Sequence, residues 1–201
     1  DTRFFFVLSP PLAKLLIAYG ARFAGYTRDC FDFASLGADF PEECGVAGAA
    51  ALRLVPATMG SLTVLLSYIA ARLLSLSPIS ALLAAVLLLF DGMHIVISRI
   101  AMADAILICL SHASLVLALV AFRRYTAMQR KPALMALVGA GLFSGLALAT
   151  KWTAIATPVL LVSIALFGIP PFLPDEPLPV ADVAVLVGAM ALAYLGTFVW
   201  F

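Results

Sequence analysis

Charged side chains, cysteine and histidine are all scarce in this sequence, and each shortage excludes a class of protein. Charged residues make up 11% of the 201 positions, against about 25% in a soluble domain. The formal net charge is +1, so nothing indicates a nucleic acid as partner. Three cysteines and two histidines are too few for a disulfide-rich scaffold and show no metal-binding spacing. Phosphate-binding loops, serine-hydrolase elbows and zinc-protease motifs are also missing.

Apolar residues, by contrast, account for 64% of the chain, and the mean hydropathy is +1.13. A soluble core of this size could not bury so much apolar surface, so the expected solvent is a lipid bilayer. Backbone groups in lipid must bond to one another, and the alternating pattern of barrel strands does not occur. The sequence therefore predicts an all-α fold, a polytopic membrane helix bundle.

Charge-free stretches of roughly 20 residues indicate where such a chain crosses the bilayer. Because the first residue is Asp1 and the last residues lie in an apolar run, we expect an internal part of a longer protein. After residue 53 we expect six spanning helices, at about residues 54–73, 79–97, 104–122, 133–150, 153–169 and 182–201.

Residues 1–53 are expected to form a loop outside the membrane with one interfacial helix at about residues 10–26. Lys14 and Arg22 are eight positions apart, so they share a helical face. The alternative is a short spanning helix whose cations reach the head groups. Cys30 and Cys44 fall in this loop either as a disulfide or as free thiols, whereas Cys109 is expected in the core.

The connector of residues 123–131 sets the predicted sidedness, because it carries four Lys or Arg residues. Cytoplasmic connectors are enriched in these cations. Alternation of the six spans then places residues 1–53, the turn at residues 99–104 and Lys151 together on the lumenal or outer face.

The few ionisable residues at membrane depth are candidates for function, because each costs roughly 2.5–3.5 kcal/mol on insertion scales. Arg99 and Asp104 flank one turn, and Lys151 and Trp152 end a span on the same side. The two cations suit a phosphate, and the indole ring suits a sugar or a lipid. Lys14, on the interfacial helix, is expected to assist in binding a lipid phosphate at the entrance of this cavity.

The same residues also fit roles in packing. Arg99 can pair with Asp104 or Asp91, and Lys151 with Trp152 can form an interfacial anchor. His94, three positions after Asp91 on a predicted helical face, is more typical of a hydrogen-bonded packing residue than of a catalyst. A further packing signal comes from two glycines four positions apart, which favour a close helix contact. These glycines are Gly141 and Gly145.

Four segments in register resemble a known family. They are Arg3–Leu16 (RFFFVLSPPLAKLL), Arg53 with Ala57–Val64 (ATMGSLTV), Ile97–Asp104 (ISRIAMAD) and Gly145–Thr153 (GLALATKWT). Their order and spacing resemble the protein O-mannosyltransferases, which are glycosyltransferases of the GT-C superfamily. The resemblance covers essentially the whole chain.

The resemblance implies a membrane domain of the GT-C type and transfer of mannose, with inversion, from dolichyl phosphate mannose to Ser or Thr of secretory proteins. It further implies the lumenal face of the endoplasmic reticulum, or the plasma membrane in a prokaryote. The implied partners are the lipid-linked donor, an acceptor polypeptide, membrane lipid and a homologous partner subunit. No cofactor and no metal are evident.

The resemblance also implies that the general base is one of an Asp-Glu pair that precedes the Pro-Pro segment, and hence lies upstream of Asp1. No catalytic residue is therefore assigned within this chain. Val7 and Ser9 stand where the family has Asp and His, so an inactive scaffolding paralogue is one alternative. Another GT-C transferase that uses a lipid-phosphate sugar, and a membrane transporter, are the others.

Overall fold

The computed structural model describes residues 10–26, 45–167 and 178–198, and it forms only helices and their connections there. The α-helical class predicted from the sequence is confirmed. The helices are α1 (Leu12–Phe23), α2 (Gly45–Leu73), α3 (Pro78–Leu89), α4 (Gly92–Arg99), α5 (Ala103–Thr126), α6 (Arg130–Leu148), the 3₁₀ helix η3 (Trp152–Ile155), α7 (Ala156–Phe167) and α8 (Val180–Gly196).

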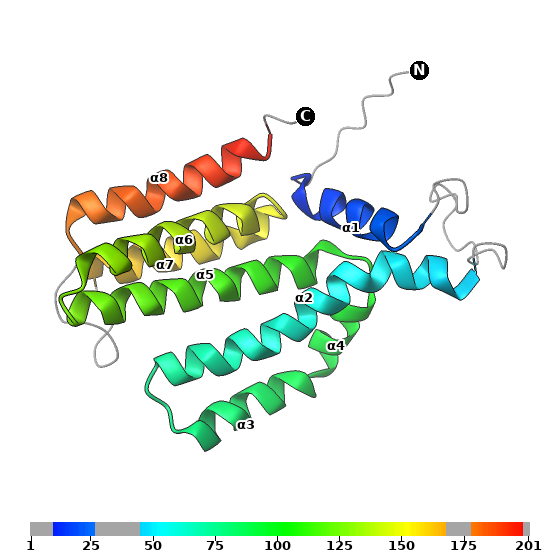
Figure 1. Cartoon of the computed structure of the whole chain (residues 1–201), viewed down its shortest axis with the longest axis horizontal. Helices are drawn as coiled ribbons and strands as arrows, with labels where there is room; N and C mark the ends of the chain where they lie inside the picture. Colours follow the sequence, from blue (N-terminus) through cyan, green and yellow to red (C-terminus); the bar gives the residue numbers. More distant parts are fainter. Residues whose placement is uncertain (1–9, 27–44, 168–177, 199–201) are drawn as a thin grey trace.

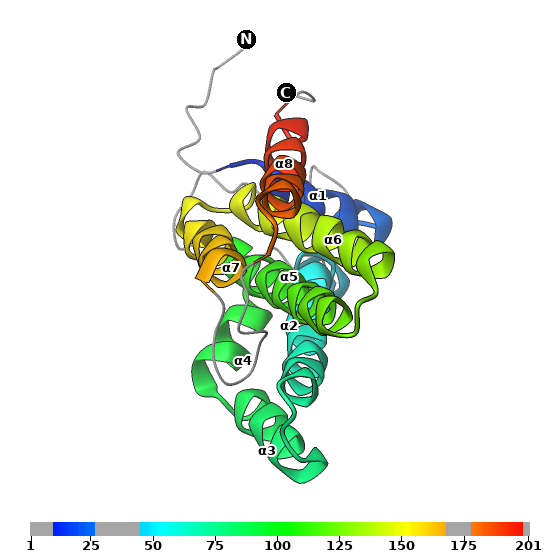
Figure 2. The same cartoon turned by 90° about the vertical axis from the view of Figure 1, so that its left-hand side faces the viewer.

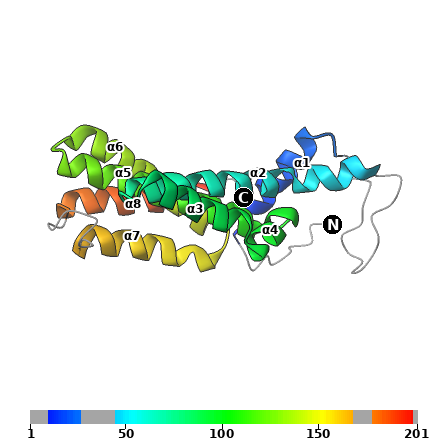
Figure 3. The same ribbon diagram turned by 90° about the horizontal axis from the view of Figure 1, so that it is seen from below.

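The helices pack as a sheet-like stack with α5 at its centre. Helix α5 contacts α2 on one side and α6 on the other, while α6 contacts α8 and α2 contacts α3. Figure 1 shows these five helices side by side, and Figure 2 shows them end-on in the order α8, α6, α5, α2 and α3. Figure 3 shows α7 along one face of the stack. Apolar side chains between α5, α6, α7 and α8 form the largest core cluster.

The chain alternates between two ends of this stack. One end, which we call the connector end, holds the turns at residues 74–77 and 127–129 and the start of α8 (Figure 1). The other, which we call the site end, holds α1, α4 and the turns at residues 100–102 and 149–151. Among the described residues, the turns predicted to lie on one side, at residues 100–102 and 149–151, therefore lie at the same end of the stack. That the site end is lumenal stays a prediction.

Three helical stretches are long and apolar enough to cross a bilayer, namely Ala50–Leu73, Ala103–Thr126 and Arg130–Leu148. A fourth crossing arises if α3 and α4 act as one span, although they meet at a bend of 57°. The stretches Trp152–Phe167 and Val180–Gly196 are apolar but shorter. The chain is thus a multi-pass membrane protein, and the count of six spans stays a prediction.

The span predicted over residues 79–97 is wrong as a single helix. Helix α3 ends at Leu89, and Asp91 caps the start of α4, where its Oδ1 accepts the backbone N–H of Met93 at 3.2 Å and that of His94 at 3.5 Å. A carboxylate that caps new amides starts a helix, whereas the prediction placed Asp91 inside one. Asp91 and His94 therefore do not share a continuous helical face.

The predicted loop of residues 1–53 also ends too late. Helix α2 already begins at Gly45, and Arg53 is an exposed residue within it. The sequence prediction took the first charge-free position as the start, but an exposed arginine does not interrupt a helix. Helix α1 falls inside the predicted helix at residues 10–26, with Gly25 at φ +88° just after its end. The interfacial placement of α1 stays a prediction.

Two further expectations concern cysteines and glycines. Cys109 is buried, as expected, whereas Cys30, Cys44, Val7 and Ser9 lie outside the described residues.

Gly141 and Gly145 face α8 so closely that no side chain would fit. A Cβ on Gly141 would lie 2.6 Å from the carbonyl oxygen of Leu186, and one on Gly145 would lie 2.3 Å from that of Met190. The predicted close helix contact is confirmed.

Candidate functional site

An ion pair at the site end joins two of the residues that the sequence singled out. Lys151 Nζ donates to Asp104 Oδ1 at 2.8 Å, and both side chains are partly exposed, at 40% and 28%. Asp104 lies in the first turn of α5, where a carboxylate is favoured by the helix dipole. Lys151 lies at the junction of α6 and η3. The alternative that Asp104 pairs with Arg99 is not what the structure shows.

Helix α1 covers this end of α5 and α6. The backbone N–H of Leu12 donates to the carbonyl of Ala149 at 3.2 Å, two positions before Lys151. Ala13 is buried in an apolar cluster with residues of α5 and α6. Lys14, the next residue, is exposed, and within the described part of the chain it forms no ion pair. The α1 start thus lies over the helix ends that carry the Lys151–Asp104 pair.

Trp152 begins a short row of aromatic rings. Its side chain is 54% exposed, and its ring lies 5.7 Å from that of Tyr194 on α8, centre to centre. The ring of Phe198 lies 5.0 Å from that of Tyr194. Tyr194 and Phe198 are not among the residues expected from the sequence, although their spacing of four positions is a signal for neighbouring rings on one helical face. The row offers aromatic surface at the site end, the same end of the bundle as the Lys151–Asp104 ion pair.

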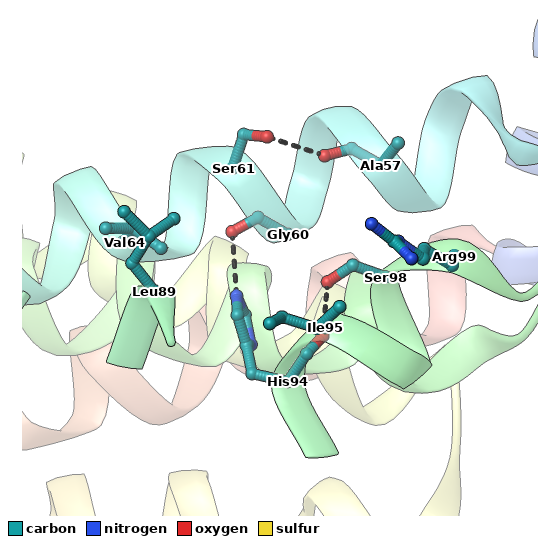
Figure 4. Close-up of a pocket in the computed structure, with 9 residues that line it drawn as sticks. All are labelled: Ala57, Gly60, Ser61, Val64, Leu89, His94, Ile95, Ser98 and Arg99. Carbon is teal, nitrogen blue, oxygen red and sulfur yellow. Dashed lines mark hydrogen bonds between the residues drawn. The ribbon is translucent and has the colours of Figure 1, made fainter. Parts of the chain in front are cut away.

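Arg99 and His94 belong to a different part of the site end, a pocket between α2 and α4. His94 is buried, and its Nε2 donates to the carbonyl of Gly60 at 3.0 Å. The packing role considered for His94 therefore matches its contacts. The pocket has a volume of about 280 Å³, and Figure 4 shows its lining. The lining residues are Ala57, Gly60, Ser61, Val64, Leu89, His94, Ile95, Ser98 and Arg99.

The two candidate phosphate-binding cations thus sit beside different helix pairs. Lys151 bonds between the α6–η3 junction and α5, whereas Arg99 lines the pocket between α2 and α4. Among the described residues, no carboxylate lies within ion-pair distance of Arg99. Sequence spacing alone could not show this, because both residues precede or follow turns at the same end.

At the connector end the structure adds a cluster that sequence analysis missed. Asp182 on α8 is only 3% exposed; its Oδ2 accepts the hydroxyl of Tyr125, and its Oδ1 accepts a guanidinium N–H of Arg130 at 3.1 Å. From the sequence, Asp182 marks only the start of the last predicted span, and Arg130 belongs to the cationic connector. No local signal links positions more than 50 residues apart. The cluster fastens α8 to α5 and α6.

Within the described residues, no group of three His, Cys, Asp or Glu side chains is placed to hold a metal ion. What the described residues of the site end do offer is binding by charge and by aromatic surface. This end presents the ammonium of Lys151 held by the carboxylate of Asp104, the exposed Lys14 on helix α1, and the exposed indole ring of Trp152.

A family model described as dolichyl-phosphate-mannose-protein mannosyltransferase matches residues 1–194. Dolichyl-phosphate-mannose–protein mannosyltransferase 1 of Saccharomyces cerevisiae is 30% identical over 156 residues, covering 77% of this chain and 18% of its own length. Its namesake in Candida albicans is 31% identical over 158 residues, with coverages of 77% and 17%.

Among solved structures, the S. cerevisiae protein O-mannosyltransferase Pmt1-Pmt2 complex bound to the sugar donor matches with a TM-score of 0.68. The identity is 25%, and the match covers 96% of this chain and 26% of that chain. The chain therefore spans less than a fifth of the length of the curated relatives named above.

Proposed function

Since the chain belongs to the dolichyl-phosphate-mannose-protein mannosyltransferase family, we propose that it forms part of an enzyme that transfers mannose from dolichyl phosphate mannose to Ser or Thr hydroxyls of secretory proteins. The observation that carries the proposal is the Lys151–Asp104 ion pair at 2.8 Å. It links two of the segments on which the family resemblance rests, and it places a cation at one end of a membrane bundle, where a lipid-linked phosphate would lie.

The ion pair suits a phosphate diester because of how lysine distributes its protons. Lys151 has three N–H donors, and one of them is taken by Asp104, so two remain for phosphate oxygens. Asp104 holds the ammonium in place but also cancels its charge. Lys14 on α1 is proposed to supply the missing positive charge, and Trp152 to stack against the sugar. Arg99 lines a separate pocket between α2 and α4 and is not assigned to the donor.

The remaining parts of the proposal follow from the family. The site end is proposed to face the lumen of the endoplasmic reticulum. The general base is proposed to belong to an Asp-Glu pair preceding Asp1, so we assign no catalytic residue within this chain. The matched solved structure is a complex of two mannosyltransferases, which supports a homologous partner subunit.

Replacing Lys151 by glutamine in the full-length protein is expected to raise the KM for the donor about tenfold or more. The reason is the loss of a charge-assisted hydrogen bond, worth about 1.5–3 kcal/mol, to the phosphate. The measurement is the rate of transfer of labelled mannose to an acceptor peptide at varied donor concentration. Lys131→Gln, an exposed lysine at the connector end, is the matched control. An unchanged donor KM in folded Lys151→Gln would refute the proposal.

Sidedness has its own test in engineered glycosylation acceptors. An Asn-X-Thr site placed between residues 34 and 40 is expected to be glycosylated in cells, because that segment is proposed to be lumenal. A site placed at residues 125–130, in the cationic connector, is expected to stay unmodified. Gel mobility before and after glycosidase treatment reads out both, and modification at 125–130 alone would invert the topology.

A further inference from the structure

The pocket between α2 and α4 is built by a break in the membrane helix and by a missing side chain. The bend of 57° after α3 turns α4 out of line, and the His94–Gly60 bond holds α4 against α2. A Cβ on Gly60 would lie only 2.1 Å from the hydroxyl oxygen of Ser98. Glycine is therefore needed where α2 and α4 approach each other. The volume of about 280 Å³ is near the lower limit for small-molecule sites. It therefore suits a head group rather than a whole lipid.

The two ends of the pocket differ in chemistry (Figure 4). Arg99 and Ser98 lie at one end, and Val64 and Leu89 lie at the other. The apolar end adjoins side chains that the chain leaves exposed, including Leu65 and Leu89 itself. In a membrane these exposed leucines contact acyl chains. A ligand with a polar head at Arg99 and a hydrocarbon tail along Leu89 matches both ends.

Hydrogen bonding at the polar end selects the kind of head group. The guanidinium of Arg99 has no carboxylate partner among the described residues, so it is available to a phosphate. Ser61 donates its proton to the carbonyl of Ala57 at 3.0 Å, and Ser98 donates its proton to that of His94 at 2.6 Å. Their hydroxyl oxygens can therefore only accept. The matching ligand carries a phosphate together with N–H or O–H donors.

We propose that this pocket binds the head group of a membrane phospholipid that has hydrogen-bond donors, such as phosphatidylethanolamine. Arg99 binds the phosphate, and the oxygens of Ser61 and Ser98 accept from the ammonium. The acyl chains run along Val64 and Leu89. This site is separate from the proposed donor site at Lys151, and it does not depend on the activity proposed above.

The test compares two lipids whose head groups differ by three N-methyl groups, which remove the N–H donors of the ammonium and enlarge it. The full-length protein is placed in phosphatidylcholine nanodiscs that contain a photoreactive phosphatidylethanolamine or phosphatidylcholine probe, and crosslinking to residues 57–64 and 89–99 is measured by peptide mapping. The ethanolamine probe is expected to label this region several-fold more, because choline has no N–H donor. Arg99→Gln is expected to reduce its labelling about tenfold, with Arg99→Lys retaining part of it.

Three further measurements separate this site from the alternatives. The double variant Ser61→Ala/Ser98→Ala is expected to remove the preference for ethanolamine over choline. Arg22→Gln, an exposed cation on α1, is the control that should leave labelling unchanged. Equal labelling by the two probes in the unmodified protein would overturn the proposal. Displacement of the probe by dolichyl phosphate mannose would also overturn it, because the pocket would then belong to the donor.

Discussion

Substitution of Gly145 by leucine is expected to push α8 away from α6 and to destabilise the bundle by about 3 kcal/mol or more. A Cβ at this position would lie 2.3 Å from the backbone oxygen of Met190 and 2.8 Å from Cβ of Ala193. Neither atom can rotate away, since one belongs to the backbone and the other is fixed to it. The helices themselves would have to separate, with loss of their contacts.

Gly188 provides the matched control, because it lies on α8 with nothing within 4 Å of the position that a Cβ would take. Thermal unfolding of the full-length protein in detergent, followed by circular dichroism, compares the two leucine variants. Gly145→Leu should unfold at a clearly lower temperature, and Gly188→Leu should stay close to the unmodified protein. Equal unfolding temperatures would show that α6 and α8 are not in this close contact.

The Asp182 cluster leads to the second large effect. Asp182→Ala removes the carboxylate that accepts from Tyr125 and Arg130. The lost bond from Tyr125 alone is expected to cost about 1.5–3 kcal/mol, and its hydroxyl is left partly buried without a partner. Asp182→Asn keeps a hydrogen-bond acceptor but no charge, so its stability should fall between that of Asp182→Ala and that of the unmodified protein. Resistance of the full-length protein to unfolding by dodecyl sulfate measures the series.

The location of this cluster makes its effect separable from activity. Asp182 lies at the connector end and the Lys151–Asp104 pair at the site end (Figure 1). The fraction of Asp182→Ala that remains folded should therefore keep the donor KM of the unmodified protein. A changed donor KM in that fraction would mean that the two ends are coupled. An unfolding resistance equal to that of the unmodified protein would show that the cluster does not hold α8.

The helices themselves were largely predictable, because composition and charge-free runs in lipid leave few alternatives. The positions of α5 and α6 follow from the apolar runs that end at charged residues. The break between α3 and α4 was not found, since Leu88, Leu89 and Phe90 continue the apolar run up to Asp91. Only the capping bonds of Asp91 distinguish a new helix from a charged residue within an old one.

For the candidate site, the sequence pattern singles out Lys151 and Asp104 but does not show that they pair with each other. Their cost at membrane depth points to both residues, but their pairing across 47 positions depends on how α5 meets α6. The sequence pattern groups Arg99 with Lys151, because both lie near turns on one side. Its place in a separate pocket depends on the bend at Asp91, which the pattern of apolar residues does not encode.

The bend also limits how much hydrocarbon this part of the protein can cover. Helix α3 has 12 residues and α4 has 8, at 57° to each other. With α3 along the membrane normal, the pair spans only about 25 Å. A bilayer core is about 30 Å thick on average and a few Å thinner in the endoplasmic reticulum, and each Å of mismatch costs a fraction of a kcal/mol. If α3 and α4 cross the bilayer as one span, the membrane beside α3 has to thin locally, and bilayer thickness then acts directly on the angle between α3 and α4.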